Sequence, residues 1–481
     1  MLRPALRLLT LALGVACVVA AGCSAKKTLV PDLPPQTSLF VQGPVDTVNH
    51  VVHLFWFGSD VDGSVVGFEF RLISSLAPAD TDWKFTAKLD SVFTIFTPGG
   101  FAAPRFEVRA IDNTGQRDPT PAVEDFQFSN HPPIVTFNSP RLGSRDTSFA
   151  TATISWTASD PDGDASKLTF RLWLDGNAAN PRTVIGNTFV VPTADFLQAG
   201  AINSGPRTLF IQATDDGGLA GPIDQMTWFV MAPVTGNDAR LLIIDDAPGA
   251  GSLTIDTVYT NAAARNLPAG TFRVLKLEVN QPFRSSADME QSFRQFKSVL
   301  WYRGIQTNLS TLLQSYPDAV ANYISNGGKL YLEGLNLVDG QNSSGSLPNS
   351  FVSSYLGSDF LYLGPGANPA DSTVSWSISS AVAGKAVILR SSLLADSLRQ
   401  QQLYVGLRGF AVRDTNNVIL WARAGNMSQP QPFDLPIGVD IPQPGGGRLM
   451  MVSTPLRGAN GFFSVPRYVA KVLQRLGITG P

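Results

Sequence analysis

Two segments of the chain carry the same pattern about 100 positions apart, and this repetition constrains the fold most strongly. Trp56 to Gly63 (WFGSDVDG) recurs as Trp156 to Gly163 (WTASDPDG). At the same offset, Phe70-Arg71-Leu72 recurs as Phe170-Arg171-Leu172. Each repeat is long enough to bury a core of its own. The sequence therefore predicts two successive domains of one architecture.

The residues within each repeat alternate in the way that half-buried strands do. Apolar side chains fall on every second position at Phe68, Phe70 and Leu72. A later strand, Phe106 to Asp112 (FEVRAID), has its counterpart in Leu209 to Asp215 (LFIQATD). Short runs of this kind, separated by Gly, Asp and Pro turns, predict antiparallel β-sandwiches. We place the first at residues 36–130 and the second at residues 131–234.

The repeats resemble fibronectin type III and related immunoglobulin-like modules. The resemblance rests on a Trp in an early strand, an aromatic strand after a turn, and a late strand that ends in Ala-x-Asp. It covers roughly Pro34 to Pro233. The family implies a spacer role or the binding of proteins or glycans, and it implies no fixed catalytic residues.

The Asp-x-Asp-Gly turns admit two interpretations. Asp160, Asp162 and Asp164 supply three closely spaced carboxylates, and calcium prefers such oxygen ligands. The twelfth position of an EF-hand loop counted from Asp160 is Arg171 rather than Glu. Asp and Gly also form tight turns through local hydrogen bonds and positive φ. We favour the turn, and calcium is the one cofactor that the sequence suggests.

The chain changes character in the region that we assign to a third domain, residues 238–481. Apolar runs alternate there with segments of helical spacing, which predicts a doubly wound parallel sheet. Residues 339–440 break this rhythm and predict a β-rich insertion. A last helix is expected from about Pro466 to Gly477. The predicted parallel strands are Leu241–Asp245, Phe272–Val279, Ser298–Tyr302, Lys329–Glu333 and Gly447–Ser453.

The segment Tyr323 to Gly334 (YISNGGKLYLEG) gives this domain a resemblance to class I glutamine-amidotransferase-like, flavodoxin-like domains. The matching element is Gly-Gly followed by a strand, and the resemblance covers about Ala239 to Gly477. The catalytic members of that family use a Cys nucleophile after a strand, with His and Glu as its base and orienting group. The resemblance thus implies an enzyme fold whose nucleophile must be sought in this sequence.

This chain lacks the residues that the family's chemistry needs. A nucleophilic Cys or Ser requires a base within hydrogen-bonding reach. The region after residue 238 contains neither Cys nor His, so we predict a degenerate, non-catalytic domain. The cysteines are Cys17 and Cys23, and the histidines are His50, His53 and His131.

Polar side chains follow the predicted parallel strands at their carboxyl ends, where ligands bind in such sheets. These residues are Asp245, Asp246, Arg303, Glu333 and Asn336. If they converge, they form a ligand site, and paired carboxylates could perform acid–base catalysis. Strand ends also become polar simply because they meet water, and an Asp there can cap a helix. A hydrolase or ligand sensor is therefore an alternative function.

The amino terminus has the features of an export signal. Arg3 and Arg7 precede an apolar run from Leu8 to Ala21. About 14 apolar residues fit a signal sequence and are too few to span a bilayer comfortably. Ala-Ala-Gly before Cys23 resembles the lipobox of bacterial lipoproteins, which implies a diacylglycerol on Cys23. Ordinary signal cleavage and an uncleaved anchor are the alternatives.

These features predict a signal peptide at residues 1–22, a lipidated tether at residues 23–35, and a location in the cell envelope. Because Ser rather than Asp follows Cys23, the resemblance implies the outer membrane in a cell that has two. The net charge of −2 and the lack of a basic stripe argue against nucleic-acid binding. Without cysteines beyond Cys23, the mature body has no disulfides.

We therefore predict a membrane-anchored surface lipoprotein with a binding or structural role, whose partners are the membrane and envelope proteins or glycans. Glycan binding through exposed aromatic side chains is a further alternative, with Trp301, Trp376 and Trp421 as candidates.

Overall fold

The structure is a computed structural model that describes most of the chain. The predictions for Cys23, Asn336 and Trp376 lie outside the described residues, as does part of the predicted β-rich insertion. The described ranges are 31–41, 50–74, 82–138, 146–234, 240–247, 252–278, 280–304, 311–334, 337, 347–356, 361–362, 387–394, 398–400, 409–410, 415–424, 433–456 and 464–478.

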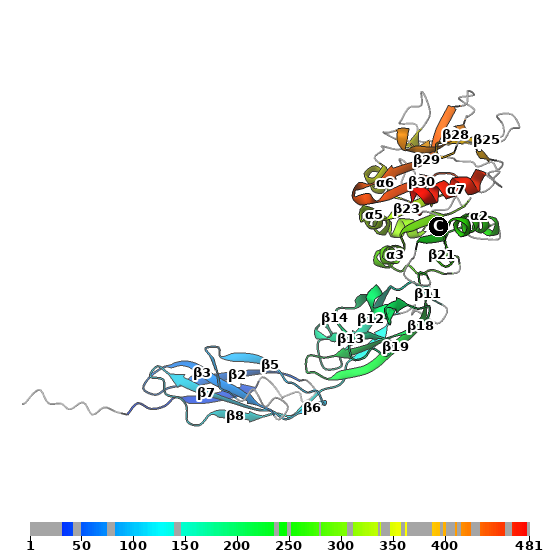
Figure 1. Ribbon diagram of the computed structural model, residues 1–481. Coiled ribbons are helices and arrows are strands. Elements are labelled where there is room, and N and C mark those ends of the chain that lie inside the picture. Colours follow the sequence, from blue (N-terminus) through cyan, green and yellow to red (C-terminus); the bar gives the residue numbers. More distant parts are fainter. Residues whose placement is uncertain are drawn as a thin grey trace, which may run out of the picture. The chain divides into compact units, whose positions relative to one another are not determined.

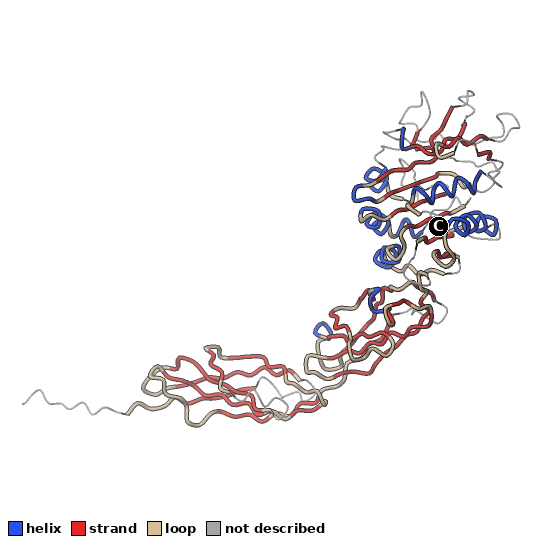
Figure 2. The backbone as a smooth tube through the Cα atoms, viewed as in Figure 1, coloured by secondary structure: helices blue, strands red, loops and turns tan. Residues whose placement is uncertain are grey.

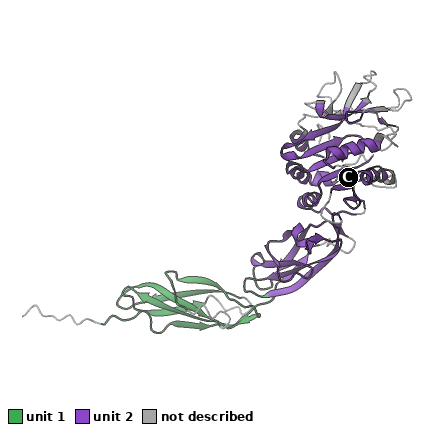
Figure 3. Ribbon diagram, in the orientation of Figure 1, with its two compact units in different colours: residues 1–132, 160–163, 215–219 green, residues 133–159, 164–214, 220–481 purple. Residues whose placement is uncertain are grey.

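The chain divides into two compact units (Figure 3). Unit 1 contains Met1–Pro132 together with two short loops of the second repeat, Asp160–Gly163 and Asp215–Leu219. Unit 2 contains the rest of the second repeat and the carboxy-terminal domain. Strands predominate in both repeats, whereas the α-helices lie in the carboxy-terminal domain (Figure 2).

The first repeat is an antiparallel β-sandwich. Its inner positions alternate along each strand, so that Val52, Leu54 and Trp56 are buried while their neighbours face outward. The ring of Trp56 stacks on Phe106 of the opposite sheet with 5.8 Å between centroids. One sheet contains β1 (Gln36–Val41), β2 (Val51–Ser59) and β5 (Asp90–Thr94), and the other contains β4 (Lys84–Thr86), β3 (Val65–Ile73), β7 (Arg105–Asp112) and β8 (Ala122–Asp125). The short strands β6 (Phe101–Ala102) and β9 (Phe128–Ser129) pair with each other.

The second repeat is also a sandwich, with Trp156 and Trp228 fully buried in its core. Its first sheet contains β10 (Ile134–Phe137), β12 (Ala152–Ser159) and β15 (Thr188–Val191). Its second sheet contains β11 (Thr147–Ser148), β19 (Ala220–Val230), β18 (Gly205–Thr214), β13 (Thr169–Leu174) and β14 (Arg182–Ile185). All pairs are antiparallel except β11 with β19, which are parallel. Smaller elements are β16 (Leu197–Gln198), β17 (Ala201–Ile202) and the turns η2 (Ala165–Lys167) and η3 (Thr193–Phe196).

The carboxy-terminal domain is built on a nine-stranded sheet of the described residues (Figure 1). The strands β21 (Phe272–Lys276), β20 (Leu241–Asp245), β22 (Ser298–Tyr302), β23 (Lys329–Glu333) and β30 (Arg448–Val452) run parallel in this order. The predicted insertion extends the same sheet, because β29 (Phe433–Pro442), β28 (Val418–Ala424), β25 (Val387–Ser391) and β26 (Leu398–Gln400) continue it antiparallel beyond β30.

Helices cover both faces of this sheet. On one face α2 (Ser252–Asn266) and α7 (Ser464–Arg475) share a core with β20, β22, β23 and β30. On the other face lie α3 (Ser286–Phe293), α4 (Thr311–Ser315), α5 (Pro317–Ser325) and α6 (Asn349–Leu356). Ser285 caps α3 by accepting from the Asp288 amide, and Gly327, with a φ of 90°, follows the last residues of α5. The remaining elements are the strand pair β24 (Leu361–Tyr362) and β27 (Gly409–Phe410) and the turns η4 (Thr415–Asn417) and η5 (Pro444–Gly446).

Some predicted boundaries were wrong. The strand expected to continue to Val279 ends at Lys276. The last helix begins at Ser464, close to the expected start near Pro466. Phe296, which continues the apolar spacing of α3, lies beyond the end of that helix and is buried nonetheless. Apolar periodicity reports burial, and it does not fix where the backbone leaves the helix. Among the described residues, no helix has the length and hydropathy needed to cross a bilayer.

Within unit 2 the second sandwich packs directly on the carboxy-terminal domain. Phe149 is fully buried in the core on the α3 side of the large sheet, and its ring meets Phe296 edge-on at 5.4 Å. The Thr153 hydroxyl donates to Asp288 Oδ1 at 2.7 Å, and the amide of Arg284 donates to Asp288 Oδ2 at 3.1 Å. Burial raises the pKa of Asp288. Phe149 of the sandwich therefore belongs to the core of the sheet domain, while the rest of the sandwich keeps a core of its own.

Candidate functional site

Two of the polar residues predicted at the carboxyl ends of the parallel strands meet in an ion pair. Arg303 Nε donates to Asp246 Oδ2 at 3.1 Å, and the indole of Trp301 donates to the same oxygen at 3.1 Å. Arg303 is 4 % exposed, and this burial lowers its pKa. The backbone amide of Asp246 donates to Tyr302 O at 3.0 Å, which joins the ends of β20 and β22.

Asp245, the last residue of β20, has its own local contacts. Its carboxylate accepts from the amide of Ala247 at 3.1 Å, and its carbonyl accepts from the amide of Leu277 at 2.9 Å. The residue is 3 % exposed. These contacts shape the turn after β20, as Asp side chains commonly do.

Glu333, the last residue of β23, is fully enclosed by protein. Its carboxylate accepts from the hydroxyls of Tyr259 and Tyr331, the latter at 2.7 Å, and from the amide of Leu456 at 3.0 Å. Burial raises the pKa of Glu333 to about 7, although the three hydrogen bonds act in the opposite direction. Tyr468 is buried beside this cluster, and burial and the Glu333 charge both raise its pKa.

The predicted residues are thus distributed over two groups because successive side chains of a strand point to opposite faces. Tyr302 pairs with Asp245 on one side and with Glu333 on the other, so these three positions share a face. The core on that face contains α2 and α7. Asp246 and Arg303 come one position later, and their contact with Trp301 belongs to the face of α3 and α5. The Glu333 backbone, through its carbonyl, accepts from the amide of Arg303 at 2.9 Å.

The aromatic side chains proposed for glycan binding differ in access. Trp301 is fully buried, so a glycan cannot reach its ring, and this candidate was wrong. The apolar run around Trp301 predicted a buried strand, and the ring belongs to the core that this strand forms. Trp421 lies on β28 and is half-buried.

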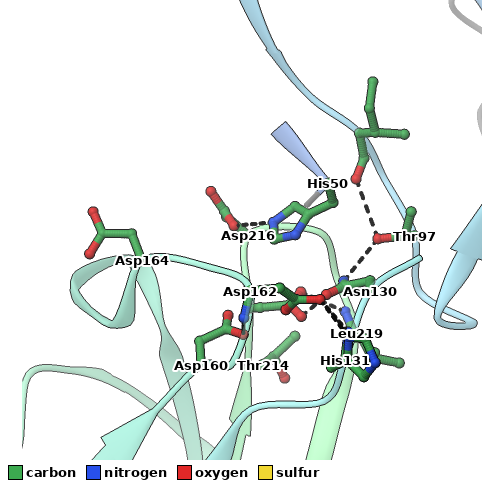
Figure 4. A network of polar contacts seen from close by, with 12 residues as sticks. His50, Thr97, Asn130, His131, Asp160, Asp162, Asp164, Thr214, Asp216 and Leu219 are labelled. Carbon is green, nitrogen blue, oxygen red and sulfur yellow. Dashed lines mark hydrogen bonds and ion pairs between the residues drawn. The ribbon is translucent and has the colours of Figure 1, made fainter. Parts of the chain in front are cut away.

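Unit 1 contains a second polar group, which sequence reasoning did not identify (Figure 4). His50, fully buried, pairs with Asp216 through Nε2 at 2.6 Å. The amide of Thr97 donates to Gly217 O at 2.7 Å. The side-chain amide of Asn130 donates to Thr97 Oγ1 at 2.8 Å and to Asp215 Oδ2 at 3.0 Å. The only sequence signal was that His50 and the neighbouring aspartates Asp215 and Asp216 lie in polar segments of the two repeats.

The three acids proposed as calcium ligands have different surroundings. Asp160 Oδ1 accepts from the amide of Asp162 at 3.4 Å, as in the predicted turn. Asp162 Oδ2 accepts from the backbone amide of His131 at 2.8 Å and contacts the ring Nδ1 of that residue at 2.9 Å. Asp164 instead caps η2 by accepting from the amide of Ser166 at 2.9 Å. Burial and the neighbouring Asp162 raise the pKa of Asp160 to about 6.

No group of three or more His, Cys, Asp and Glu side chains that could hold a metal ion occurs within the described ranges. Asp160, Asp162 and Asp164 do not form such a group, because the third carboxylate serves the helical turn.

The similarity of this chain to known proteins is low. No protein-family model and no curated protein matches the chain. Solved structures that are similar include the fibronectin(III)-like modules of Clostridium thermocellum CbhA, with 17 % identity, a TM-score of 0.19, and coverage of 40 % of this chain and 95 % of that one.

Two further solved structures are similar at a comparably low level. The FN1–FN3 domains of chicken CNTN1 share 14 % identity at a TM-score of 0.18, over 41 % of this chain and 66 % of that one. The PKD1 domain of Vibrio anguillarum Epp shares 12 % identity at a TM-score of 0.15, over 20 % and 96 %. The chain's own strand pairing defines the class: two β-sandwich modules followed by a domain with a mixed sheet and helices on both faces.

Proposed function

We propose that this protein is a lipid-anchored component of the cell envelope with a binding or structural role. In this proposal its amidotransferase-like, doubly wound domain is non-catalytic. One observation supports the non-catalytic assignment: the polar groups at the carboxyl edge of the parallel strands are hydrogen-bonded to the domain's own side chains. Asp246 is held by Trp301 and Arg303, and Glu333 is held by two tyrosines and a backbone amide.

These contacts oppose acid–base catalysis for a physical reason. A general base must come within hydrogen-bonding reach of the proton that it abstracts. The Glu333 carboxylate accepts three donors from the protein itself and lies 1 % exposed among aromatic side chains. The sequence after residue 238 also contains no Cys and no His to serve as nucleophile or base.

The anchor in this proposal is a lipid on Cys23, and its support comes from the sequence. Positive residues, an apolar run and small residues before a single cysteine occur together at the amino terminus. The following tether, residues 23–35, is rich in Pro and begins a body without further thiols. If the cell has two membranes, we expect the outer one to hold the anchor.

Metabolic labelling with a palmitate analogue tests the anchor, and the chain offers a matched control. Cys17 lies inside the apolar run, whereas Cys23 follows the small residues. We expect Cys23→Ala to lose the label and to leave the membrane fraction, and Cys17→Ala to keep both. A label that persists in Cys23→Ala, or a wild-type chain recovered without lipid from the cytosol, would overturn the anchor.

The non-catalytic half is tested with the purified full chain and panels of amide and ester substrates. We expect no turnover above that of a heat-denatured sample. Turnover that is abolished by both Glu333→Gln and Asp246→Asn would contradict this proposal and support a hydrolase. Affinity capture from envelope extracts, with the Cys23→Ala chain as bait, then identifies the protein or glycan partner.

A further inference from the structure

Buried oxygen atoms without a hydrogen-bond partner gather in one part of unit 1. They are Asp160 Oδ2, Asp162 Oδ1 and Asn130 Oδ1. The Asp162 side chain is 3 % exposed, and Asn130 is 5 % exposed. A buried carboxylate or amide oxygen that lacks a donor is costly, because it has lost water without replacement. Three such atoms in neighbouring residues point to a group that supplies positive charge.

The charges around these atoms lead to the same conclusion. Asp160, Asp162 and Asp215 are close enough to interact electrostatically. Hydrogen bonds from Asn130 and from the Leu219 amide already satisfy Asp215. His131 faces Asp162, and His50 is paired with Asp216. These hydrogen bonds and ion pairs therefore leave the oxygens Asp160 Oδ2 and Asp162 Oδ1 with excess negative charge.

We propose that unit 1 binds a calcium ion through the carboxylates of Asp160 and Asp162 and the side-chain oxygen of Asn130. Asp215 adds negative charge nearby without being a ligand. Calcium accepts six to eight oxygen ligands in flexible geometry, so backbone carbonyls and water can complete the shell. An all-oxygen set without sulfur or imidazole ligands disfavours zinc.

This ligand set differs from the one that the sequence suggested. Asn130 takes the place of Asp164, whose carboxylate caps η2. The set contains two carboxylates and an amide, so it is not a group of three acids or histidines. Gly163 keeps the space beside these oxygens free of a side chain, because a Cβ there would lie 2.3 Å from Asp160 Oδ2 and 3.3 Å from the His50 ring.

The first repeat carries a related arrangement. Asp60 corresponds to Asp160, and Asp112 corresponds to Asp215 in the repeated pattern. Asp60 Oδ2 and Asp112 Oδ2 are likewise buried without a hydrogen-bond partner. A Cβ at Gly63 would lie 2.5 Å from Asp60 Oδ2. Both repeats therefore keep an open carboxylate oxygen at the same place in the same turn.

The test is calcium titration of the chelator-treated full chain in detergent, followed by calorimetry and hydrogen exchange. We expect saturable binding in the range of about 0.1–1 mM that is typical of extracellular modules. Calcium at about 100 times its dissociation constant should raise the folded-to-unfolded ratio of unit 1 about 100-fold. Amides of residues 160–163 and 215–219 should exchange more slowly with calcium than with magnesium at equal concentration.

Two variants distinguish the ligands. Asp160→Asn should bind one calcium fewer than the wild type, and without calcium it should be at least as stable, because a buried charge has been removed. Asp164→Asn is the matched control: asparagine caps a helical turn as well as aspartate does, and binding should not change.

The proposal fails if the wild-type chain shows no saturable binding. It also fails if Asp160→Asn binds as many ions as the wild type, or if Asp164→Asn loses binding as Asp160→Asn does. Hydrogen exchange on the wild type alone decides the matter if Asp160→Asn does not fold: unchanged exchange at residues 160–163 overturns the proposal. None of these outcomes depends on the lipid anchor or on the non-catalytic assignment.

Discussion

Replacing Glu333 by Gln should stabilise the carboxy-terminal domain at alkaline pH and leave it nearly unchanged in acid. The carboxyl group is buried among tyrosines, and its pKa rises from 4.5 to about 7 on folding. A folded-state pKa above the unfolded one means that the folded protein binds the proton more tightly. Below pH 4.5 the carboxyl group of Glu333 is neutral in both states and costs no folding free energy. As the pH rises from 4.5 to about 7, its ionisation in the unfolded state lowers the stability of the folded domain.

The magnitude follows from the two pKa values. Each tenfold change in proton affinity corresponds to about 1.4 kcal/mol, so complete ionisation of Glu333 costs about 3 kcal/mol of folding free energy. Glutamine has the same shape and carries no charge. Its oxygen can accept from the amide of Leu456, and its NH₂ group can donate to the hydroxyls of Tyr259 and Tyr331 once these rotate.

The measurement compares Glu333→Gln with the wild type by hydrogen exchange of the amides in β23 and α7 between pH 4.5 and pH 8. Exchange reports local stability, which is needed because a chain of several domains does not unfold in two states. The difference between the variants cancels the titration of other groups and the intrinsic effect of pH on exchange. Glu278→Gln, an exposed acid of the same domain, serves as the control.

The difference in stability should grow from near zero at pH 4.5 to about 3 kcal/mol in favour of glutamine at pH 8. A difference that is constant across this range, or that favours glutamate at pH 8, would refute the reasoning. Either result would mean that the three hydrogen bonds compensate the buried charge fully.

Three further predictions test the packing. Phe149→Ala should lower the stability of unit 2 by about 3–5 kcal/mol, because it empties a fully buried site, whereas Phe229→Ala, at a 39 % exposed ring, should cost much less; hydrogen exchange of the amides in unit 2 measures both. Gly218→Ala should destabilise unit 1 by more than about 1 kcal/mol in hydrogen exchange, because φ is +86° and a Cβ would lie 2.4 Å from Phe96; a neutral result would contradict the backbone described for this loop. Thr153→Val should cost about 1–3 kcal/mol and accelerate exchange in α3, because it leaves buried Asp288 short of a donor; unchanged exchange would exclude that role.

The parallel strands of the carboxy-terminal domain were the most predictable elements. The ranges Leu241–Asp245, Ser298–Tyr302 and Lys329–Glu333 were predicted with the ends that the structure has. A strand buried on both faces is apolar through its interior, and the first charged residue after that apolar run lies at the end of the strand or just after it. The two repeats were predictable for a different reason. A motif that occurs twice can be recognised from the sequence without any knowledge of the fold.

The arrangement of the candidate site could not be predicted in the same way. Neighbouring parallel strands bring Asp245, Asp246, Arg303 and Glu333 to one edge, but an edge has two faces. Which face each side chain takes depends on the register between strands, and register is a property of the pairing rather than of one strand's sequence. The tyrosines that hold Glu333 come partly from α2, far away in the sequence.

The unsatisfied oxygens of the second repeat were also hidden in the sequence. Asp160, Asp162 and Asp164 are equally spaced acids, and nothing in that spacing says that the third caps a helical turn. Asn130 lies in the segment before the second repeat, and it joins the group only through the folded loops. Long-range contacts of this kind follow from tertiary structure alone.

The burial of Phe149 has a consequence for how this protein can be divided. The change in composition near residue 237 suggests a place to cut, but a fragment that begins at residue 238 would lose the ring that covers Phe296. It would also leave Asp288 without its hydroxyl partner. The second sandwich thus supplies side chains that the sheet domain needs for its own packing. A fragment made to study the sheet domain should therefore contain the second sandwich as well.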